Sequence, residues 1–336
     1  MVEFDRGTKA LVTGGAGFIG SHLCEHLVEL GVSVVCFDDL SSGKMEYILA
    51  LLSKPNFEFV RGDLMNPNDF QEIPENVDTI FHLAAKVGVR RYVEDPIDVM
   101  RTNIHGTENL LEFAMKRNVK RFVLASTSEV YGKNLSVSLK EDSDRVLGPT
   151  TIDRWCYSSA KAIDEHLCNA YFRRHKLPIT TLRYFNVYGP RQETSDYGAV
   201  VSIFIRRVLR DEPPLVHGDG KQTRSFAYVA DAVEGTLRAV TEERAVGETF
   251  NLGNPVETTI VELAGLVIDL AGKSDRLKPQ FVPHEEFYGS WYEDVPRRVP
   301  DISKIREVLG FEPRYTLAEG LRATIDWYRK HSMEVT

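Results

Sequence analysis

The sequence has few cysteines, no long apolar run and no excess of positive charge, and each shortage excludes a class of protein. Four cysteines among 336 residues, none in a Cys-x-x-Cys pair, are too few for a disulfide framework, so we expect reduced thiols. No segment approaches the roughly 18 consecutive apolar residues of a membrane span, and the first residues are charged where a signal peptide requires an apolar segment. We therefore expect a cytoplasmic protein with no membrane partner.

The charge balance is acidic, since 41 Lys and Arg against 49 Asp and Glu give a formal net charge of -8. A nucleic-acid backbone requires a clustered basic face, so we expect no nucleic-acid partner, although a local basic pocket for a small anion is compatible with this balance. The histidines are scattered without metal-ligand spacing, which predicts no metal site. The length allows one large or two ordinary domains.

Short β-branched runs alternate with amphipathic stretches in the first half of the chain, which is the pattern of βαβ units in a parallel sheet. The expected strands are residues 9–13, 33–38, 57–60, 79–83, 121–125 and 179–183, and the expected helices are residues 21–30, 103–117 and 153–174. The strands are almost entirely apolar, which suits a sheet covered on both faces. The predicted fold class is α/β, a Rossmann-type doubly wound parallel sheet.

Prolines become frequent after about Tyr184 and break the chain into shorter pieces, which predicts a smaller interleaved C-terminal α/β lobe. The first domain is expected to cover residues 1–183, together with about 229–252 and part of the tail. The second lobe is expected to cover residues 184–228 and 253–336.

Gly14, Gly17 and Gly20 follow the first expected strand directly and open the next helix, with Phe18 and Ile19 between the last two. Glycines at this spacing let the backbone turn sharply and let a pyrophosphate approach the helix N-terminus. A glycine-rich structural turn is the alternative. The strand before, the helix after and an acidic residue at the end of the next strand together favour a dinucleotide site.

Asp38 ends the second expected strand, where a carboxylate accepts hydrogen bonds from the adenosine ribose. It would repel a 2′-phosphate, so NAD is favoured over NADP. Asp39 is the alternative residue for this role. Asp63 and Leu64 follow the third strand and either reach the adenine or form a strand-end turn.

Tyr157 and Lys161 place a phenol and an ammonium group at i and i+4, on one face of a helix that begins near Arg154. An ammonium group beside a phenol favours the phenolate and lowers its pKa from about 10 toward neutrality. A solvent-facing pair is the alternative. The hydroxyl-rich segment 126–129 supplies a third partner, because Thr127 can hold the oxygen of a carbinol while Tyr157 takes its proton.

These residues belong to motifs that span nearly the whole chain. They are residues 13–20 (TGGAGFIG), 82–85 (HLAA), 126–132 (STSEVYG), Tyr157-x-x-x-Lys161, 183–191 (RYFNVYGPR), 222–226 (QTRSF) and 297–301 (RRVPD). With them the sequence resembles the extended short-chain dehydrogenase/reductases, an NAD-dependent family of nucleotide-sugar epimerases, dehydratases and decarboxylases. It is most similar to the UDP-glucuronate decarboxylases.

The resemblance implies NAD as the cofactor, a UDP-sugar as the substrate, and a homodimer that pairs through the helices near residues 104–117 and 154–173. The first domain would bind NAD and the second lobe would bind the nucleotide sugar. Candidate cofactor-binding residues are Gly14, Gly17, Phe18, Ile19, Gly20, Asp38, Asp39, Asp63, Leu64, Leu83, Ala84, Ala85, Asn103, Tyr157, Lys161 and Tyr184, with Asn103 under the helix that carries Tyr157. Asn186, Arg191, Arg224 and Arg298 would grip the pyrophosphate or the sugar, and we expect Arg191, Arg224, Arg297 and Arg298 to converge.

By the same resemblance the reaction begins when Tyr157 takes the proton of the sugar 4-hydroxyl as hydride passes to NAD, so that a 4-keto sugar forms. A 4-keto uronate is a β-keto acid, which loses carbon dioxide because the ketone accepts the electron pair. Decarboxylases combine a small hydroxyl residue, a glutamate and an arginine, as Ser128, Glu129 and Arg298 do here. The predicted catalytic residues are Thr127, Ser128, Glu129, Tyr157 and Lys161.

The resemblance leaves other reactions open. UDP-sugar 4-epimerases generally carry a small or uncharged residue at position 129, and 4,6-dehydratases usually have Asp-Glu at 128 and 129. Arg154 and Trp155, just ahead of Tyr157, favour the decarboxylation of UDP-glucuronic acid to UDP-xylose or its 4-keto pentose. The segment 85–89 (AKVGV) is closer to epimerases and dehydratases. A non-catalytic NAD-binding regulator is a further alternative, although regulators have typically lost the Tyr or the Lys.

Overall fold

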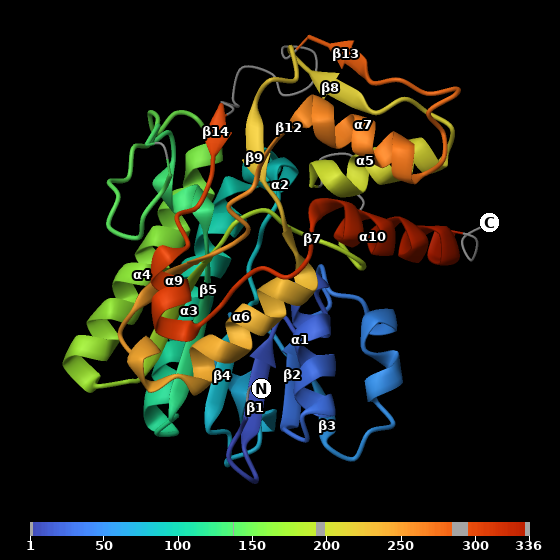
Figure 1. The fold of residues 1–336 in the computed structure, drawn as a ribbon. Helices are drawn as coiled ribbons and strands as arrows, with labels where there is room; N and C mark the ends of the chain where they lie inside the picture. The colour runs from blue at the N-terminus through green and yellow to red at the C-terminus, as the bar shows by residue number, and fades with distance from the viewer. Residues whose placement is uncertain (1–2, 137, 193–198, 284–294, 333–336) are drawn as a thin grey trace.

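A seven-stranded parallel sheet organises the computed structural model, which describes residues 3–136, 138–192, 199–283 and 295–332 (Figure 1). The strands lie in the order β11-β6-β5-β4-β1-β2-β3, and every neighbouring pair is parallel. They are β1 (Lys9–Thr13), β2 (Ser33–Asp38), β3 (Phe57–Arg61), β4 (Thr79–His82), β5 (Arg121–Thr127), β6 (Ile179–Tyr184) and β11 (Thr249–Leu252). The chain proceeds in opposite directions from β1 and β4, so a ligand crevice is expected at the carboxyl ends of these two strands.

Helices cover both faces of this sheet. On one face lie α1 (Phe18–Glu29) and α6 (Val229–Thr241), and on the other lie α3 (Pro96–Lys116) and α4 (Arg154–His175). Adjacent residues of β1 show the alternation, because Val12 packs into the core under α1 while Leu11 packs into the core under α3. The predicted doubly wound α/β fold is confirmed.

The strand predictions agree with the structure to within two residues at each end, and β1 and β2 coincide with them. The helix predicted from residue 103 is different, because α3 begins at Pro96. Asp95 caps this helix by accepting a hydrogen bond from the backbone N–H of Asp98, and Pro96 suits the first helical position, where no N–H partner is needed.

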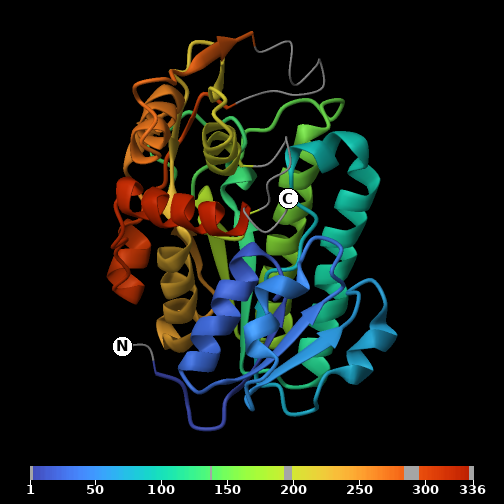
Figure 2. The same ribbon diagram turned by 90° about the vertical axis from the view of Figure 1, so that its right-hand side faces the viewer.

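Small sheets and the helices α5 (Val200–Leu209), α7 (Ile260–Leu270) and α10 (Leu317–Ser332) lie in the upper part of the molecule in Figure 1. The sheets are β12-β9-β14, β13-β8 and β10-β7, from β7 (Val187–Tyr188), β8 (Leu215–His217), β9 (Thr223–Ser225), β10 (Ala227–Tyr228), β12 (Glu257–Thr259), β13 (Gln280–Val282) and β14 (Arg297–Arg298). The helices α5, α7 and α10 share a separate core. Both views show α10 between the large sheet and α7 (Figures 1 and 2).

The two parts alternate along the chain. Both α6 and β11 follow β9 and β10, yet α6 packs on the large sheet and β11 is one of its strands. The helix α9 (Ser303–Leu309) packs on β11. The exact boundaries of the predicted domains stay a prediction. None of the helices in the described ranges is long and apolar enough to cross a membrane.

A buried ion pair joins β6 to α4 beside the carboxyl end of the sheet. Arg183 donates two hydrogen bonds to Glu165, at 2.9 Å from Nε and 2.7 Å from Nη2, and a third to the hydroxyl of Tyr131 at 2.8 Å. The hydroxyl of Tyr131 in turn donates to Asn251 on β11 at 2.6 Å. This network therefore connects four elements: α4, β6, β11 and the 3-10 helix after β5 that carries Tyr131.

Replacing Glu165 with Ala should destabilise the fold by about 3 to 5 kcal/mol, because it leaves the guanidinium group of Arg183 buried without its carboxylate. Urea unfolding followed by circular dichroism measures the loss. The matched control is Glu112→Ala, which breaks an exposed pair with Lys116 and should cost about 0.5 kcal/mol or less. Equal losses in the two variants would contradict the role of the buried pair.

Candidate active site

The glycine loop lies at the crevice between β1 and β4. Gly14 has φ of +69°, and a Cβ atom there would lie 2.7 Å from the backbone nitrogen of Ala84, so only glycine fits. A Cβ atom at Gly20 would lie 2.1 Å from the carbonyl oxygen of Gly14. Gly17 is the N-cap of α1 and provides no side-chain cap, which leaves the N–H groups at the start of this helix for an anion.

The structure distinguishes Asp38 from Asp39. Asp38 is buried, and its carboxylate accepts hydrogen bonds from the backbone N–H groups of Ala16 in the glycine loop, at 3.0 Å, and of Leu40, at 2.8 Å. Burial raises the pKa of this carboxyl group. Asp39 instead caps the exposed turn at Ser41. Asp38 is therefore the carboxylate that lies against the glycine loop.

The other predicted cofactor residues differ in what they contact. Asp63 accepts a hydrogen bond from the N–H of Met65, which is the strand-end turn of the alternative interpretation, and Leu64 packs into the core under α3. Asn103 lies on α3, the helix that packs against α4. Its side chain accepts a hydrogen bond from the backbone N–H of Lys86 at 2.8 Å and donates one to the carbonyl oxygen of Lys86 at 3.1 Å. Beside the glycine loop, β4 continues into Leu83, Ala84 and Ala85. The first two residues of α1 are Phe18 and Ile19. The phenol of Tyr184 shares a hydrogen bond with Thr236 on α6.

The predicted catalytic residues come together at the end of β5. Thr127 is the last residue of this strand, and Ser128 and Glu129 lie in the 3-10 helix η4 (Ser128–Tyr131). Tyr157 and Lys161 project from α4, and the hydroxyl of Tyr157 bonds to the side chain of Thr127. This brings the predicted carbinol partners Thr127 and Tyr157 into contact.

The pKa of Tyr157 is raised, not lowered as the Tyr157–Lys161 spacing predicts. Burial is the main cause, and the negative charges of Glu129 and Asp164 add to it. The ring of Tyr92 on α2 (Val89–Glu94) stacks on that of Tyr157 at 4.9 Å. The ammonium group of Lys161 lies 2.9 Å from the carboxylate of Asp164, so its charge is compensated within α4.

Glu129 is surrounded by guanidinium groups. Its Oε1 atom lies 2.7 Å from Nη1 of Arg298 and 3.3 Å from Nη2 of Arg154. Burial alone would raise the pKa of Glu129, but Arg154, Arg298 and the more distant Arg224 lower it to about 2. Glu129 is thus held as a carboxylate in a positively charged pocket.

Arg298 has further hydrogen-bonding capacity. It is 4% exposed, and its Nε and Nη2 atoms have no hydrogen-bond partner among the described residues. These two atoms form one edge of the guanidinium group, whose parallel N–H groups match a carboxylate or a phosphate. Arg224 lies directly beside Arg298, because the two residues are in register on β9 and β14.

The structure does not bring the four expected arginines together. Arg191 binds Glu25 and Ser21 on α1, and Arg297 forms a two-bond pair with Glu257. Asn186 donates to the carbonyl oxygen of Ser225, the last residue of β9. The arginines predicted from the sequence to bind the substrate did not include Arg154. Its position three residues before Tyr157 on the same helix could have indicated that it lies near the active site. Asp164, three residues after Lys161, was missed as well.

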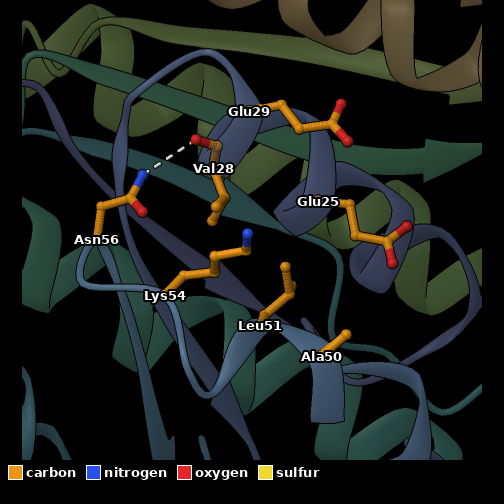
Figure 3. Close-up of a pocket in the computed structure, with 7 residues that line it drawn as sticks. All are labelled: Glu25, Val28, Glu29, Ala50, Leu51, Lys54 and Asn56. Atoms are coloured by element: carbon orange, nitrogen blue, oxygen red, sulfur yellow. Dashed lines mark hydrogen bonds between the residues drawn. The ribbon is translucent and has the colours of Figure 1, made fainter.

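A surface pocket between α1 and the 3-10 helix η2 (Leu49–Leu51) is separate from this region (Figure 3). Its lining includes Glu25, Val28, Leu51 and Lys54, and Asn56 donates to the carbonyl oxygen of Val28 at 3.0 Å. None of the predicted catalytic residues lines it, so it is not the active site.

A doubly wound sheet with a glycine loop at its crevice and a Thr–Tyr–Lys set at the next strand end defines the extended short-chain dehydrogenase/reductase class. The chain belongs to the NAD dependent epimerase/dehydratase family, whose sequence profile matches residues 10–253. It is an enzyme of this family, which carries out NAD-dependent modification of nucleotide sugars.

Relatives include two kinds of decarboxylase. The UDP-N-acetyl-alpha-D-glucosaminuronate decarboxylase of Bacillus cytotoxicus is 41% identical over 322 residues, which cover 96% of this chain and 98% of the relative. UDP-glucuronic acid decarboxylase 1 of Arabidopsis thaliana is 41% identical over 321 residues, which cover 96% of this chain and 70% of the relative.

Solved structures of epimerases are also similar. The UDP-glucose 4-epimerase of Thermotoga maritima with UDP-glucose is 35% identical, with a TM-score of 0.85, and the match covers 97% of this chain and all of that one. The UDP-glucuronic acid 4-epimerase of Bacillus cereus, in complex with UDP-glucuronic acid and NAD, is 33% identical, with a TM-score of 0.83, and covers 96% of this chain.

The ion cluster at Glu129 should make stability depend on pH. The pKa of Glu129 is lower in the folded protein, so its stabilising effect is present above pH 4.5 and is lost as the pH falls toward 2. The free energy of unfolding of the wild type should exceed that of Glu129→Gln by on the order of 3 kcal/mol at neutral pH, with the difference shrinking over that interval.

Urea unfolding at several pH values measures this difference. The matched control is Glu257→Gln, because Glu257 also pairs with an arginine and has a lowered pKa but lies near the surface. Solvent screening should make its pH-dependent difference much smaller. A Glu129→Gln difference that does not change with pH would refute the proposed ion cluster.

Proposed function

We propose that this enzyme decarboxylates UDP-glucuronic acid through a 4-keto intermediate. The observation that carries the proposal is the unpaired edge of Arg298, whose Nε and Nη2 atoms are buried beside Glu129 without a hydrogen-bond partner among the described residues. A uronate differs from the neutral sugars of most epimerases by a carboxylate at C5. A carboxylate bound at this edge would be held bidentately and would be neutralised in a pocket that already contains Arg154.

The residues at the crevice fit NAD. Gly14 and Gly20 leave no room for a side chain, so that a pyrophosphate can approach the start of α1, and Asp38 lies where a ribose hydroxyl is bound. The carboxylate of Asp38 would repel a 2′-phosphate, which favours NAD over NADP. When bound, NAD accepts the hydride from C4 of the sugar and returns it later in the cycle.

Proton transfer at the sugar is assigned to α4 and β5. Thr127 would hold the 4-hydroxyl oxygen while Tyr157 removes its proton, since these two side chains already share a hydrogen bond. When the C5–carboxylate bond breaks, the electron pair moves onto the C4 ketone as an enolate. The phenol of Tyr157 is placed to return the proton to this oxygen.

Glu129 would act at C5. A substrate carboxylate on Arg298 would share the cation that now binds Glu129, and this sharing would raise the pKa of Glu129 from its low value. Glu129 could then carry a proton to C5 after carbon dioxide leaves. Ser128, buried next to it, would keep the space at the sugar small.

The comparisons support a uronate substrate, because both decarboxylase relatives act on nucleotide-linked uronic acids by name. UDP-N-acetylglucosaminuronic acid is the second candidate substrate, since the relative named for it matches over nearly its whole length. The 4-epimerase alternative is supported by the similarity to the Bacillus cereus enzyme. We also propose a homodimer through α3 and α4, which pack side by side and expose Ile97, Met100 and Ile163.

Incubation of the purified protein with UDP-glucuronic acid should yield carbon dioxide and a UDP-pentose, identified by mass spectrometry and NMR. UDP-galacturonic acid as the product would mean epimerisation. Turnover of UDP-N-acetylglucosaminuronic acid alone would make that compound the substrate in place of UDP-glucuronic acid. Tyr157→Phe is the control, because it removes the proton acceptor and should abolish turnover while NAD still binds. Full turnover by this variant would refute the role of Tyr157.

Glu129→Gln should separate the decarboxylase from the epimerase. The amide has the shape of the acid but carries no proton to C5, so the variant should oxidise the substrate and then accumulate reduced cofactor, seen as near-ultraviolet absorbance. Glu257→Gln is the matched control on the outside of β12, and should turn over like the wild type. An epimerase would be little affected by Glu129→Gln, so unchanged turnover would contradict the decarboxylase assignment.

A further inference from the structure

Asp164 is a buried carboxylate that the proposed reaction does not use. Its side chain is 0% exposed, and its Oδ2 atom lies 2.9 Å from Nζ of Lys161, whose side chain is 2% exposed. Burial raises the pKa of Asp164, while Lys161 and the hydroxyl of Thr107 on α3 oppose this effect. A carboxylate is costly at such a site unless it is paired, so the pair has a specific role to explain.

We propose that Asp164 is a positioning residue, which holds Lys161 in place through this ion pair and whose negative charge controls how readily Tyr157 loses its proton. The proposal rests on the roles of Tyr157 and Lys161 assigned above.

The ion pair with Lys161 is the contact that compensates Asp164. Apart from this pair, both carboxylate oxygens of Asp164 are buried without a hydrogen-bond partner among the described residues. Nearby polar groups bond to each other: the N–H of Ala84 donates to Oγ1 of Thr13 at 3.4 Å, and His82 bonds to Thr13 through Nδ1 at 2.8 Å and to Thr107 through Nε2 at 2.9 Å.

His82 is a second titratable group near this pair. Burial and the charge of Lys161 lower the pKa of His82 to about 3, so the ring is neutral near pH 7. The neutral ring carries no charge that could replace Lys161 as the partner of Asp164.

The charge of Asp164 also acts on Tyr157, whose pKa it raises. The charged and titratable groups that face these residues are Glu129 on η4, Tyr92 on α2, His82 on β4, and Lys161, Glu165 and Cys168 on α4. Glu165 is paired with Arg183, whereas Glu129, although paired with Arg298, still raises the pKa of Tyr157. Loss of the charge of Asp164 would remove a second negative charge that opposes the phenolate and would leave the ammonium group of Lys161, one helical turn from Tyr157, without its carboxylate.

The test is the pH dependence of kcat/KM with the nucleotide sugar that the wild type turns over. In Asp164→Asn the rising limb, which follows deprotonation of Tyr157, should move to lower pH by about one unit. Asp164→Glu retains the charge and should keep the limb near its wild-type position. Thr107→Val removes the hydroxyl that bonds to His82 without changing a charge, so it should leave the limb near its wild-type position. An unmoved limb in Asp164→Asn overturns the proposal.

A double-mutant cycle tests the positioning role without turnover. Lys161→Met alone leaves Asp164 buried and unpaired, so urea unfolding should show a large loss of stability that Lys161→Met/Asp164→Leu recovers. Additive losses would overturn the proposal. Failure of the proposed function is distinguishable from failure of the Asp164 proposal. Turnover by Tyr157→Phe would contradict the proposed function. An inactive Tyr157→Phe together with an unmoved rising limb of the pH profile in Asp164→Asn would contradict the Asp164 proposal alone.

Discussion

The pairing of Glu129 with two buried guanidinium groups is the constraint on which the active site depends. Arg154 comes from the start of α4 and Arg298 from β14, 169 residues along the chain from Glu129. Two buried cations beside each other would repel strongly without the carboxylate, so the small β12-β9-β14 sheet is held against the end of β5 by this cluster. The same contact that joins the two parts of the molecule builds the positive pocket for the substrate.

Burial and pairing of charge also explain the properties of α4. This helix carries Arg154, Tyr157, Lys161, Asp164 and Glu165, and each of them is buried. The charges among them are compensated by Glu129, by each other or by Arg183. Such a helix has no apolar stripe on the side that faces the site, because the packing surface there consists of ion pairs. The chemistry and the packing of α4 are consequently inseparable.

Much of the fold was predictable from local patterns. The runs of β-branched residues in β1 and β2 coincide with the strands because both strands are covered on each face, so their central residues are apolar. The start of α3 was missed because the signal, Asp95 with Pro96, is a capping pattern and not an apolar period. Asp38 and Asp39 could not be separated by sequence, because the distinction depends on which carboxylate reaches the N–H of Ala16.

The sequence by itself determined the glycine loop, the Tyr157–Lys161 pair and the family, because these are short-range patterns whose spacing matches one helical turn or one strand–helix junction. Only the tertiary structure decided which charges meet. It directs Arg191 to Glu25 and Arg297 to Glu257, and it brings Arg154 and Arg298 to Glu129 and Asp164 to Lys161. The physical reason is that the pKa of a side chain such as Tyr157 depends on burial and on neighbours contributed by distant segments, which spacing along the chain does not encode.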